Sequence, residues 1–152
     1  MKRFLTIVTV SLLLVQSLSA GNYKSFKVSI YTRAYEVEKM KDPEWLESTW
    51  KTISSQLKVD RIYLETHRDR LIVPQETLDA AKAFFRAHGV EVAGGITYTI
   101  SEPNDFETYC YTKTSDRKKV QEIAEYTAKN FDYFILDDFF FVDCKCDSCI
   151  EA

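Results

Sequence analysis

The sequence lacks three features that would each point to a class of protein. It has no long run of basic residues, and its 20 Lys and Arg are outnumbered by 23 Asp and Glu. It has four glycines and no G-x-G-x-x-G motif, so a dinucleotide-binding fold has no motif support. No cysteine lies near residue 20, where a bacterial lipoprotein anchor would be attached. Binding to nucleic acid or to an anionic membrane surface is therefore not expected.

The first twenty residues have the pattern of a secretory signal peptide. Lys2 and Arg3 are followed by an apolar segment, residues 4–15, and by the small residues of 17–20. The apolar segment is too short to span a bilayer comfortably, although a retained N-terminal anchor is the alternative. Residues 1–20 therefore predict export to the periplasm or the cell exterior, an oxidising environment, with no membrane attachment after cleavage.

Residues 21–152 alternate between strand and helix patterns. The chain is 45% apolar and 14% aromatic, which is enough to bury the core of one domain. Strands are expected at 27–32, 61–65, 90–96 and 133–137, and helices are expected to begin at Pro43, Pro74 and Ser115. This β-α-β-α-β-α-β order predicts parallel strands joined by right-handed helical crossovers.

The chain is too short for a complete barrel of such units. A (β/α)₈ barrel needs about 250 residues, whereas only about fifteen follow the last expected strand. We therefore expect the α/β fold to be the parallel (βα)₄ half of a TIM-type (β/α)₈ barrel, spanning 21–152 in a truncated chain. Such a chain is expected to self-associate through its exposed sheet edges. The alternative is a complete small α/β domain of four strands.

Polar and aromatic residues follow the apolar bodies of all four expected strands. In parallel α/β folds ligands bind at the carboxyl ends of the strands, so these residues are expected to share one site. The candidates for carbohydrate contact are Arg33, Glu65, His67, Tyr98 and Phe139. Carboxylates and flat rings are the composition of a carbohydrate cleft. For His67, an ordinary hydrogen-bonded loop histidine is the alternative.

Asp137 and Asp138 end the fourth expected strand and are the candidate catalytic carboxylates. Successive side chains of a strand point to opposite faces, so only one of the two can face the site. Glycoside hydrolysis needs two carboxylates flanking the bond. The second must come from another strand, such as from Glu65, or from outside this chain. The alternative is that one aspartate caps a helix or pairs with Arg33 or Arg68.

Four cysteines form the most compact motif. Cys144-x-Cys146-x-x-Cys149 follows the fourth expected strand, and Cys110 lies in the loop after the third. Loops that follow neighbouring parallel strands can meet, so the four thiols could hold a tetrahedral structural zinc ion. Two disulfides would also suit an exported protein, free thiols are the third possibility, and the spacing does not decide among them. No cofactor is expected for catalysis itself.

The segment 132–141, followed by the cysteine motif, resembles the fourth strand of exported glycoside-hydrolase-like (β/α)₈ barrels from carbohydrate-degrading bacteria. In several such families an acid ends the fourth strand and a Cys-rich loop follows. A tyrosine four residues before Asp137 is also similar to the fourth strand of α-galactosidase-type barrels. There the acid is the nucleophile, so this resemblance favours Asp137 over Asp138. Ile135 stands where those enzymes carry a lysine, so their substrate is not implied.

Together these patterns predict an exported glycoside-hydrolase-like protein that acts on or binds carbohydrate. Because the second carboxylate is expected outside this chain, residues 21–152 alone are expected to bind sugar weakly and to hydrolyse nothing. The competing interpretation is a complete carbohydrate- or metal-binding domain without catalysis.

Overall fold

The computed structural model describes residues 23–137 and 141–151, so the expected signal peptide, Asp138 and Phe139 lie outside the described residues. A parallel four-stranded sheet with the order β1-β2-β5-β8 forms the centre of the molecule. Its strands are β1 (Ser29–Thr32), β2 (Arg61–Glu65), β5 (Glu91–Ile96) and β8 (Phe134–Leu136). This confirms the predicted α/β class and the parallel order. It is compatible with half of a TIM-type fold, in which β1 and β8 form the two edges.

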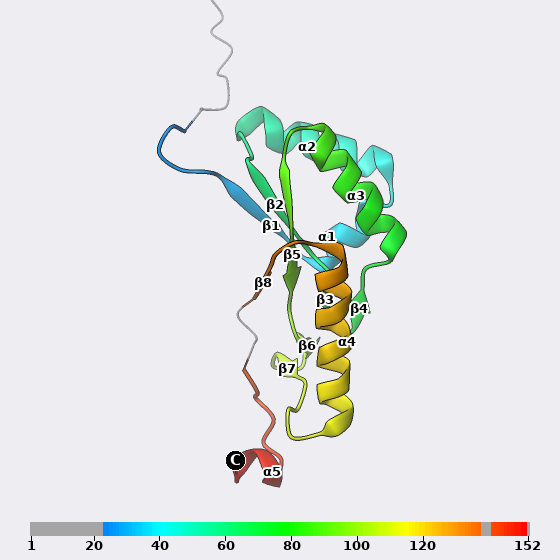
Figure 1. Cartoon of the computed structure of the whole chain (residues 1–152), viewed down its shortest axis with the longest axis vertical. Coiled ribbons are helices and arrows are strands. Elements are labelled where there is room, and N and C mark those ends of the chain that lie inside the picture. The colour runs from blue at the N-terminus through cyan, green and yellow to red at the C-terminus, as the bar shows by residue number, and fades with distance from the viewer. Residues whose placement is uncertain (1–22, 138–140, 152) are drawn as a thin grey trace, which may run out of the picture.

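Helices alternate with these strands along the chain (Figure 1). They are α1 (Ala34–Lys39), α2 (Pro43–Gln56), α3 (Gln75–Ala87), α4 (Thr114–Asn130) and α5 (Asp147–Ile150). α2 begins where the sequence predicts, because the Asp42 carboxylate accepts hydrogen bonds from the N–H groups of Glu44 and Trp45 at 3.0 and 3.3 Å. α3 follows Pro74 as predicted and ends before Gly89, whose φ is 72°. Within the described residues, no helix combines the length and apolar character needed to cross a membrane.

One helix and two hairpins lie between the elements that the sequence predicts and are additional to them. They are α1, the hairpin of β3 (His67–Arg68) with β4 (Leu71–Ile72), and the hairpin of β6 (Thr99–Ser101) with β7 (Glu107–Thr108). Each hairpin turns through two consecutive residues with positive φ. Its strands have only two or three residues, which is too short to show a periodic pattern. α4 also begins one residue before Ser115, because the turn that bonds the Lys113 N–H to the Cys110 carbonyl leads directly into the helix. Both hairpins follow strands of the sheet, so they lie at its carboxyl end.

Two apolar cores of unequal size lie on the side of the sheet that the helices cover. Ile62 and Leu64 alternate with Tyr63 along β2, so the first two point toward the helices and Tyr63 points away. The first core gathers fourteen buried residues: Ala34, Val37, Met40, Leu46, Trp50, Val59, Ile62, Leu64, Val73, Leu78, Ala81, Phe85, Val90 and Phe131. The second core has four, namely Ile96, Tyr98, Tyr109 and Ile123. The second core therefore offers much less apolar burial.

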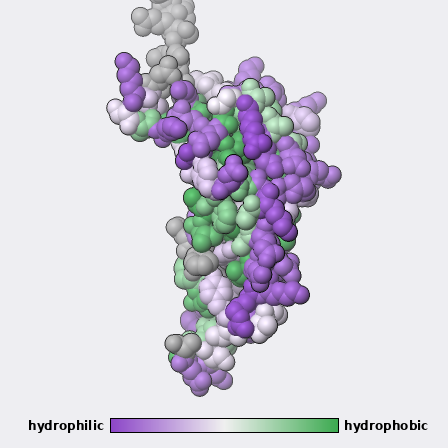
Figure 2. All heavy atoms as spheres, in the orientation of Figure 1, coloured by the Kyte–Doolittle hydropathy of each residue, from purple (hydrophilic) through white to green (hydrophobic). Residues whose placement is uncertain are grey.

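The opposite face of the sheet carries aromatic side chains. The ring of Tyr63 lies 6.4 Å from that of Tyr31 and 6.3 Å from that of Tyr133. Ile135 lies on the same face, and both it and Tyr133 are exposed. Figure 2 shows apolar surface along the side of the molecule where β8 runs, whereas the side of α4 is hydrophilic. Closure of such a sheet into a barrel would place this face in the interior.

Candidate functional site

The carboxyl ends of β2, β5 and β8 bring together residues that are far apart in the sequence. Glu65 ends β2, Thr97 follows β5 and Asp137 follows β8. Parallel pairing in register places these positions side by side, with Glu65 opposite Gly95 and Gly95 opposite Ile135. Their side chains meet around the guanidinium of Arg68, which the β3–β4 hairpin folds back over the sheet.

Glu65 is the buried centre of this cluster. It is 0% exposed, and both of its carboxylate oxygens are occupied. Oε1 accepts hydrogen bonds from Tyr31 Oη at 2.7 Å, from Arg68 Nη2 at 2.8 Å and from the Thr97 hydroxyl. Oε2 accepts from Ala34 N at 2.7 Å and from Arg68 Nε at 2.8 Å. A carboxylate bonded this completely fixes the positions of its neighbours and has no free lone pair for a substrate.

Arg68 connects Glu65 to two carboxylates nearer the solvent. Its Nη2 donates to Asp137 Oδ2 at 2.9 Å, and its Nη1 donates to Glu102 at the end of the β6 segment. Burial disfavours the charge of Arg68, but the hydrogen bonds and charge of Glu65 raise the pKa of Arg68 above its ordinary value. The Arg68 side chain is 5% exposed, whereas those of Asp137 and Glu102 are 28% and 23% exposed. Asp137 and Glu102 are therefore the carboxylates of the cluster that a ligand can reach.

Gly95 makes room for this arrangement. A Cβ atom on Gly95 would lie 2.6 Å from Tyr31 Oη, so only glycine leaves room for the tyrosine ring to extend over the sheet as far as β5 with its hydroxyl on Glu65. Burial and the Glu65 carboxylate raise the pKa of Tyr31 well above its usual value. The Tyr31 hydroxyl therefore keeps its proton and acts as a donor.

The other carbohydrate-contact candidates lie in different surroundings. His67 is fully buried in β3, and its Nδ1 lies 2.7 Å from the Thr97 carbonyl, to which it must donate. Burial lowers the pKa of His67, so the ring is neutral near pH 7. Tyr98 is buried in the second core. Arg33 is exposed and donates to Glu36 through Nε and Nη2, both at 3.1 Å.

The four cysteines meet as the loop spacing predicts. All four Sγ atoms lie within 4.8 Å of one another, and Cys110 Sγ lies 3.8 Å from that of Cys146 and 3.4 Å from that of Cys149. Sulfurs bound to one tetrahedral zinc ion lie about 3.8 Å apart, given Zn–S bonds of about 2.3 Å. Disulfide sulfurs lie about 2.0 Å apart, and all four cysteines, Cys144 included, are free thiols. The cluster could bind a metal ion.

The surroundings of the cluster also suit a metal. Thr112 Oγ1 lies 3.1 Å from Cys110 Sγ and 3.3 Å from Cys149 Sγ. This hydroxyl lowers the pKa of the Cys110 thiol to about 6, against the raising effect of burial. Asp143 accepts hydrogen bonds from the N–H and hydroxyl of Thr108 at 3.1 and 2.7 Å, which joins the two cysteine-bearing segments beside the cluster.

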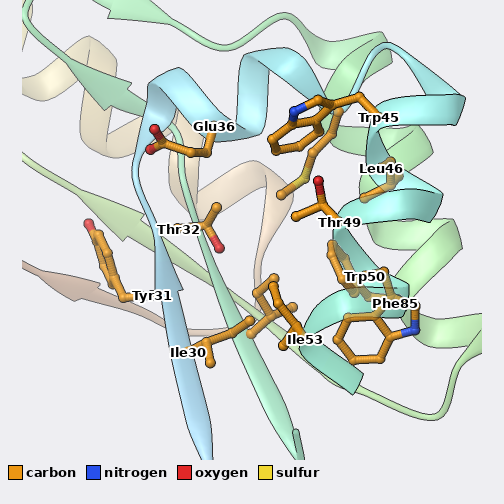
Figure 3. Close-up of a pocket in the computed structure, with 12 residues that line it drawn as sticks. Ile30, Tyr31, Thr32, Glu36, Trp45, Leu46, Thr49, Trp50, Ile53 and Phe85 are labelled. Carbon is orange, nitrogen blue, oxygen red and sulfur yellow. The ribbon is translucent and has the colours of Figure 1, made fainter. Parts of the chain in front are cut away.

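An apolar cavity of 290 Å³ lies elsewhere, between β1 and the helices α1 and α2. Figure 3 shows Trp45, Trp50 and Phe85 around it, with Tyr31 on the other side of β1. The strand therefore separates this cavity from the acidic cluster, and its wall offers few polar groups to a sugar.

Carboxylates gathered at the carboxyl end of a parallel sheet are the arrangement of an α/β enzyme site. The chain belongs to the family described as "probable glycosyl hydrolase, catalytic domain", whose sequence profile matches residues 15–152. This confirms the resemblance to glycoside hydrolases that segment 132–141 indicates.

The chain is also similar to an uncharacterized protein of Saccharolobus solfataricus, with 30% identity over 125 residues. The similarity covers 76% of this chain and 20% of that protein, so the chain spans about a fifth of the length of this relative. No solved structure matches the chain.

Sequence reasoning identified Glu65, Asp137 and the cysteines, but it left out Glu102 and considered Arg68 only as an ion-pair partner. Glu102 precedes a proline in an irregular turn, where no periodic pattern marks a residue as part of a site. Only the folding of two hairpins over the end of the sheet brings it to Arg68.

Proposed function

We propose that the acidic cluster binds a glycoside and that Asp137 is the catalytic carboxylate of this family member. The observation that carries the proposal is the contact of Asp137 with Arg68 at the carboxyl end of the fourth sheet strand. The guanidinium holds the Asp137 carboxylate in place as a hydrogen-bond acceptor. An acceptor so placed suits the nucleophile or the base of glycoside hydrolysis better than the acid.

The second carboxylate of the reaction is not Glu65. A general acid must reach the glycosidic oxygen, and Glu65 is sealed by Tyr31, Ala34, Arg68 and Thr97. Glu65 is instead the positioning residue that orients Arg68. Glu102 accepts a hydrogen bond from Arg68, as Asp137 does, so it suits an acceptor better than an acid. Supply of the acid from outside this cluster would fit the expectation that residues 21–152 alone bind sugar weakly and hydrolyse nothing.

The test is whether the full chain binds sugar. Saturation-transfer NMR measures this binding across a panel of nitrophenyl glycosides. We expect at least one sugar to bind and Asp137→Asn to weaken its binding. In a longer protein that contains this domain and hydrolyses a glycoside, Asp137→Asn should lower turnover at least about 100-fold, the scale of an acid–base group. Asp132→Asn is the matched control, because Asp132 is exposed at the amino end of the same strand.

Two results would contradict the proposal. Failure of every sugar to bind would remove the carbohydrate function and leave the competing interpretation of a metal-binding domain. If Asp137→Asn binds sugar and hydrolyses it as well as the protein with Asp137 does, Asp137 is not part of the site. We expect Asp138→Asn to have the smaller effect, because successive side chains of a strand point to opposite faces and Asp137 is the proposed catalytic residue.

We also propose that Cys110, Cys144, Cys146 and Cys149 hold a structural zinc ion. The support is the four-sulfur geometry and the Thr112 hydroxyl beside it. Native mass spectrometry should find one zinc per chain, lost when Cys110 and Cys149 are both replaced by serine. Two mass units lost per bridge, with no metal bound, would instead show two disulfides.

Export and self-association complete the proposal. The support for export is the signal-peptide pattern of residues 1–20, and the support for self-association is the apolar face near Tyr133 and Ile135 between two sheet edges. Sedimentation at increasing concentration should show species larger than the monomer. A monomer with a cooperative transition above about 60 °C would contradict the idea of an incomplete barrel.

A further inference from the structure

Negative charge exceeds positive charge in the acidic cluster. Glu65, Glu102 and Asp137 all bond to the single guanidinium of Arg68. A fourth carboxylate, Asp69, lies next to them, because its Oδ1 accepts a hydrogen bond from Glu102 N at 2.9 Å. One arginine therefore neutralises part of the charge of three carboxylates, and a fourth carboxylate lies directly beside them.

Arg68 is already committed to carboxylates of the chain itself. Each of its three guanidinium nitrogens already donates to a carboxylate, and its side chain is almost fully buried. Arg33 is exposed at the end of β1, but Glu36 engages it through two nitrogens. A carboxylate on a substrate would thus approach Asp137 and Glu102 where, among the described residues, the guanidinium that contacts both already binds three carboxylates.

We infer that this site takes uncharged glycosides and excludes acidic sugars such as uronides, an inference that rests on the proposed carbohydrate function. Sugar hydroxyls are donors, and the reachable oxygens of Asp137 and Glu102 are acceptors. A uronide replaces one of these donors with a charged acceptor. Like charges placed together at a largely desolvated site oppose binding and are a common source of discrimination.

The test compares sugars that are identical except at C6. The probes are the nitrophenyl glucoside with the glucuronide, and the galactoside with the galacturonide, at pH 7 in low salt. Whichever ring configuration binds, the uncharged member should bind at least about tenfold more tightly than the acidic one, the scale of one like-charge contact near a surface. Raising the salt concentration to 1 M should narrow this difference, because salt screens exposed charges.

Glu102→Gln locates the source of the discrimination. Removing this partly exposed charge should narrow the difference within the pair several-fold. Glu107→Gln is the matched control, because Glu107 lies on the same hairpin and bonds to Asn104 instead of Arg68. It should leave the difference unchanged.

The outcomes separate this inference from the function on which it rests. If neither member of any pair binds, the carbohydrate function itself fails. If a uronide binds as tightly as its uncharged partner, or more tightly, the function stands and the inference is overturned. A difference that neither salt nor Glu102→Gln narrows would also overturn it, because its source would then be shape and not charge. The native-chain comparison and its salt dependence hold even if the variant does not fold.

Discussion

Two regions of the molecule are held together by different means. The sheet region, residues 29–97, supplies thirteen of the fourteen buried side chains of the first core, and Phe131 completes it. The loop region, residues 98–113 with 141–151, contributes only Tyr98 and Tyr109 to a second core of four residues. α5 has no buried residue, and Ile150 is 71% exposed. Figure 1 shows the loop region extending away from the sheet beside α4.

The comparison shows what the cysteines do for the fold. Small units with too little apolar surface to bury often depend on metals or disulfides. The loop region has the four sulfurs and the Thr108–Asp143 contact to connect its segments, whereas the sheet region has apolar packing. A thiolate site that holds zinc would also protect cysteines in an oxidising compartment. If the four thiols hold the proposed zinc ion, the sheet region should depend on packing and the loop region on that metal.

The largest expected effect tests the packing of the sheet region. Leu78 is fully buried in the first core, so Leu78→Ala should lower the free energy of unfolding by about 2–5 kcal/mol. Trp45 and Trp50 are the two tryptophans and both contact this core, so their fluorescence in a urea titration reports its unfolding. Ile150→Ala, at an exposed position, is the control and should change the free energy of unfolding by less than about 0.5 kcal/mol.

Ile123→Ala makes the same kind of deletion in the second core. If it changes the tryptophan transition as much as Leu78→Ala does, the two regions unfold as one cooperative unit and the contrast between them is lost.

The sheet region was largely predictable from the sequence, and the loop region was not. Alternation along β2 and the Asp42-Pro43 helix start are local signals, and both predictions are confirmed. The β6–β7 hairpin is made of two and three residues around consecutive left-handed positions. Its conformation follows from contacts with distant segments, such as Thr108 with Asp143, and no local pattern reports them.

The same distinction applies within the candidate site. Glu65 and Asp137 could be predicted because each ends a strand, and parallel strands end at one edge. The role of Glu65 could not be predicted, because its burial results from Tyr31 packing against Gly95 and from Arg68 folding back over the sheet. Strand position identifies which carboxylates gather, whereas exposure decides which of them can act.

A smaller, local effect tests the loop region. Cys149→Ser removes one of the four sulfurs, so we expect the loss of bound zinc and at least about tenfold faster proteolysis within 141–151, because local opening needs little free energy there. The tryptophan transition of the first core should stay in place. Ser148→Ala is the matched control at an exposed neighbouring position. If Cys149→Ser shifts the tryptophan transition while 141–151 stays protected, the cluster supports the sheet region instead.

The smallest effect concerns His67, which lies between the two regions, with Thr97 on one side and Tyr109 on the other. Burial lowers the pKa of His67 in the folded protein, whereas in the unfolded chain it is about 6.5. Below that pH the unfolded chain binds a proton that the folded protein does not, so stability falls as pH falls, by at most about 1.4 kcal/mol per pH unit. Urea titrations between pH 7 and 5.5 should therefore show a free energy of unfolding that decreases as the pH falls. His67→Gln should remove this dependence on pH, and His88→Gln should retain it. Equal slopes in the native chain and His67→Gln would show that this histidine takes up its proton without unfolding the junction, and that the two regions meet less tightly than its burial indicates.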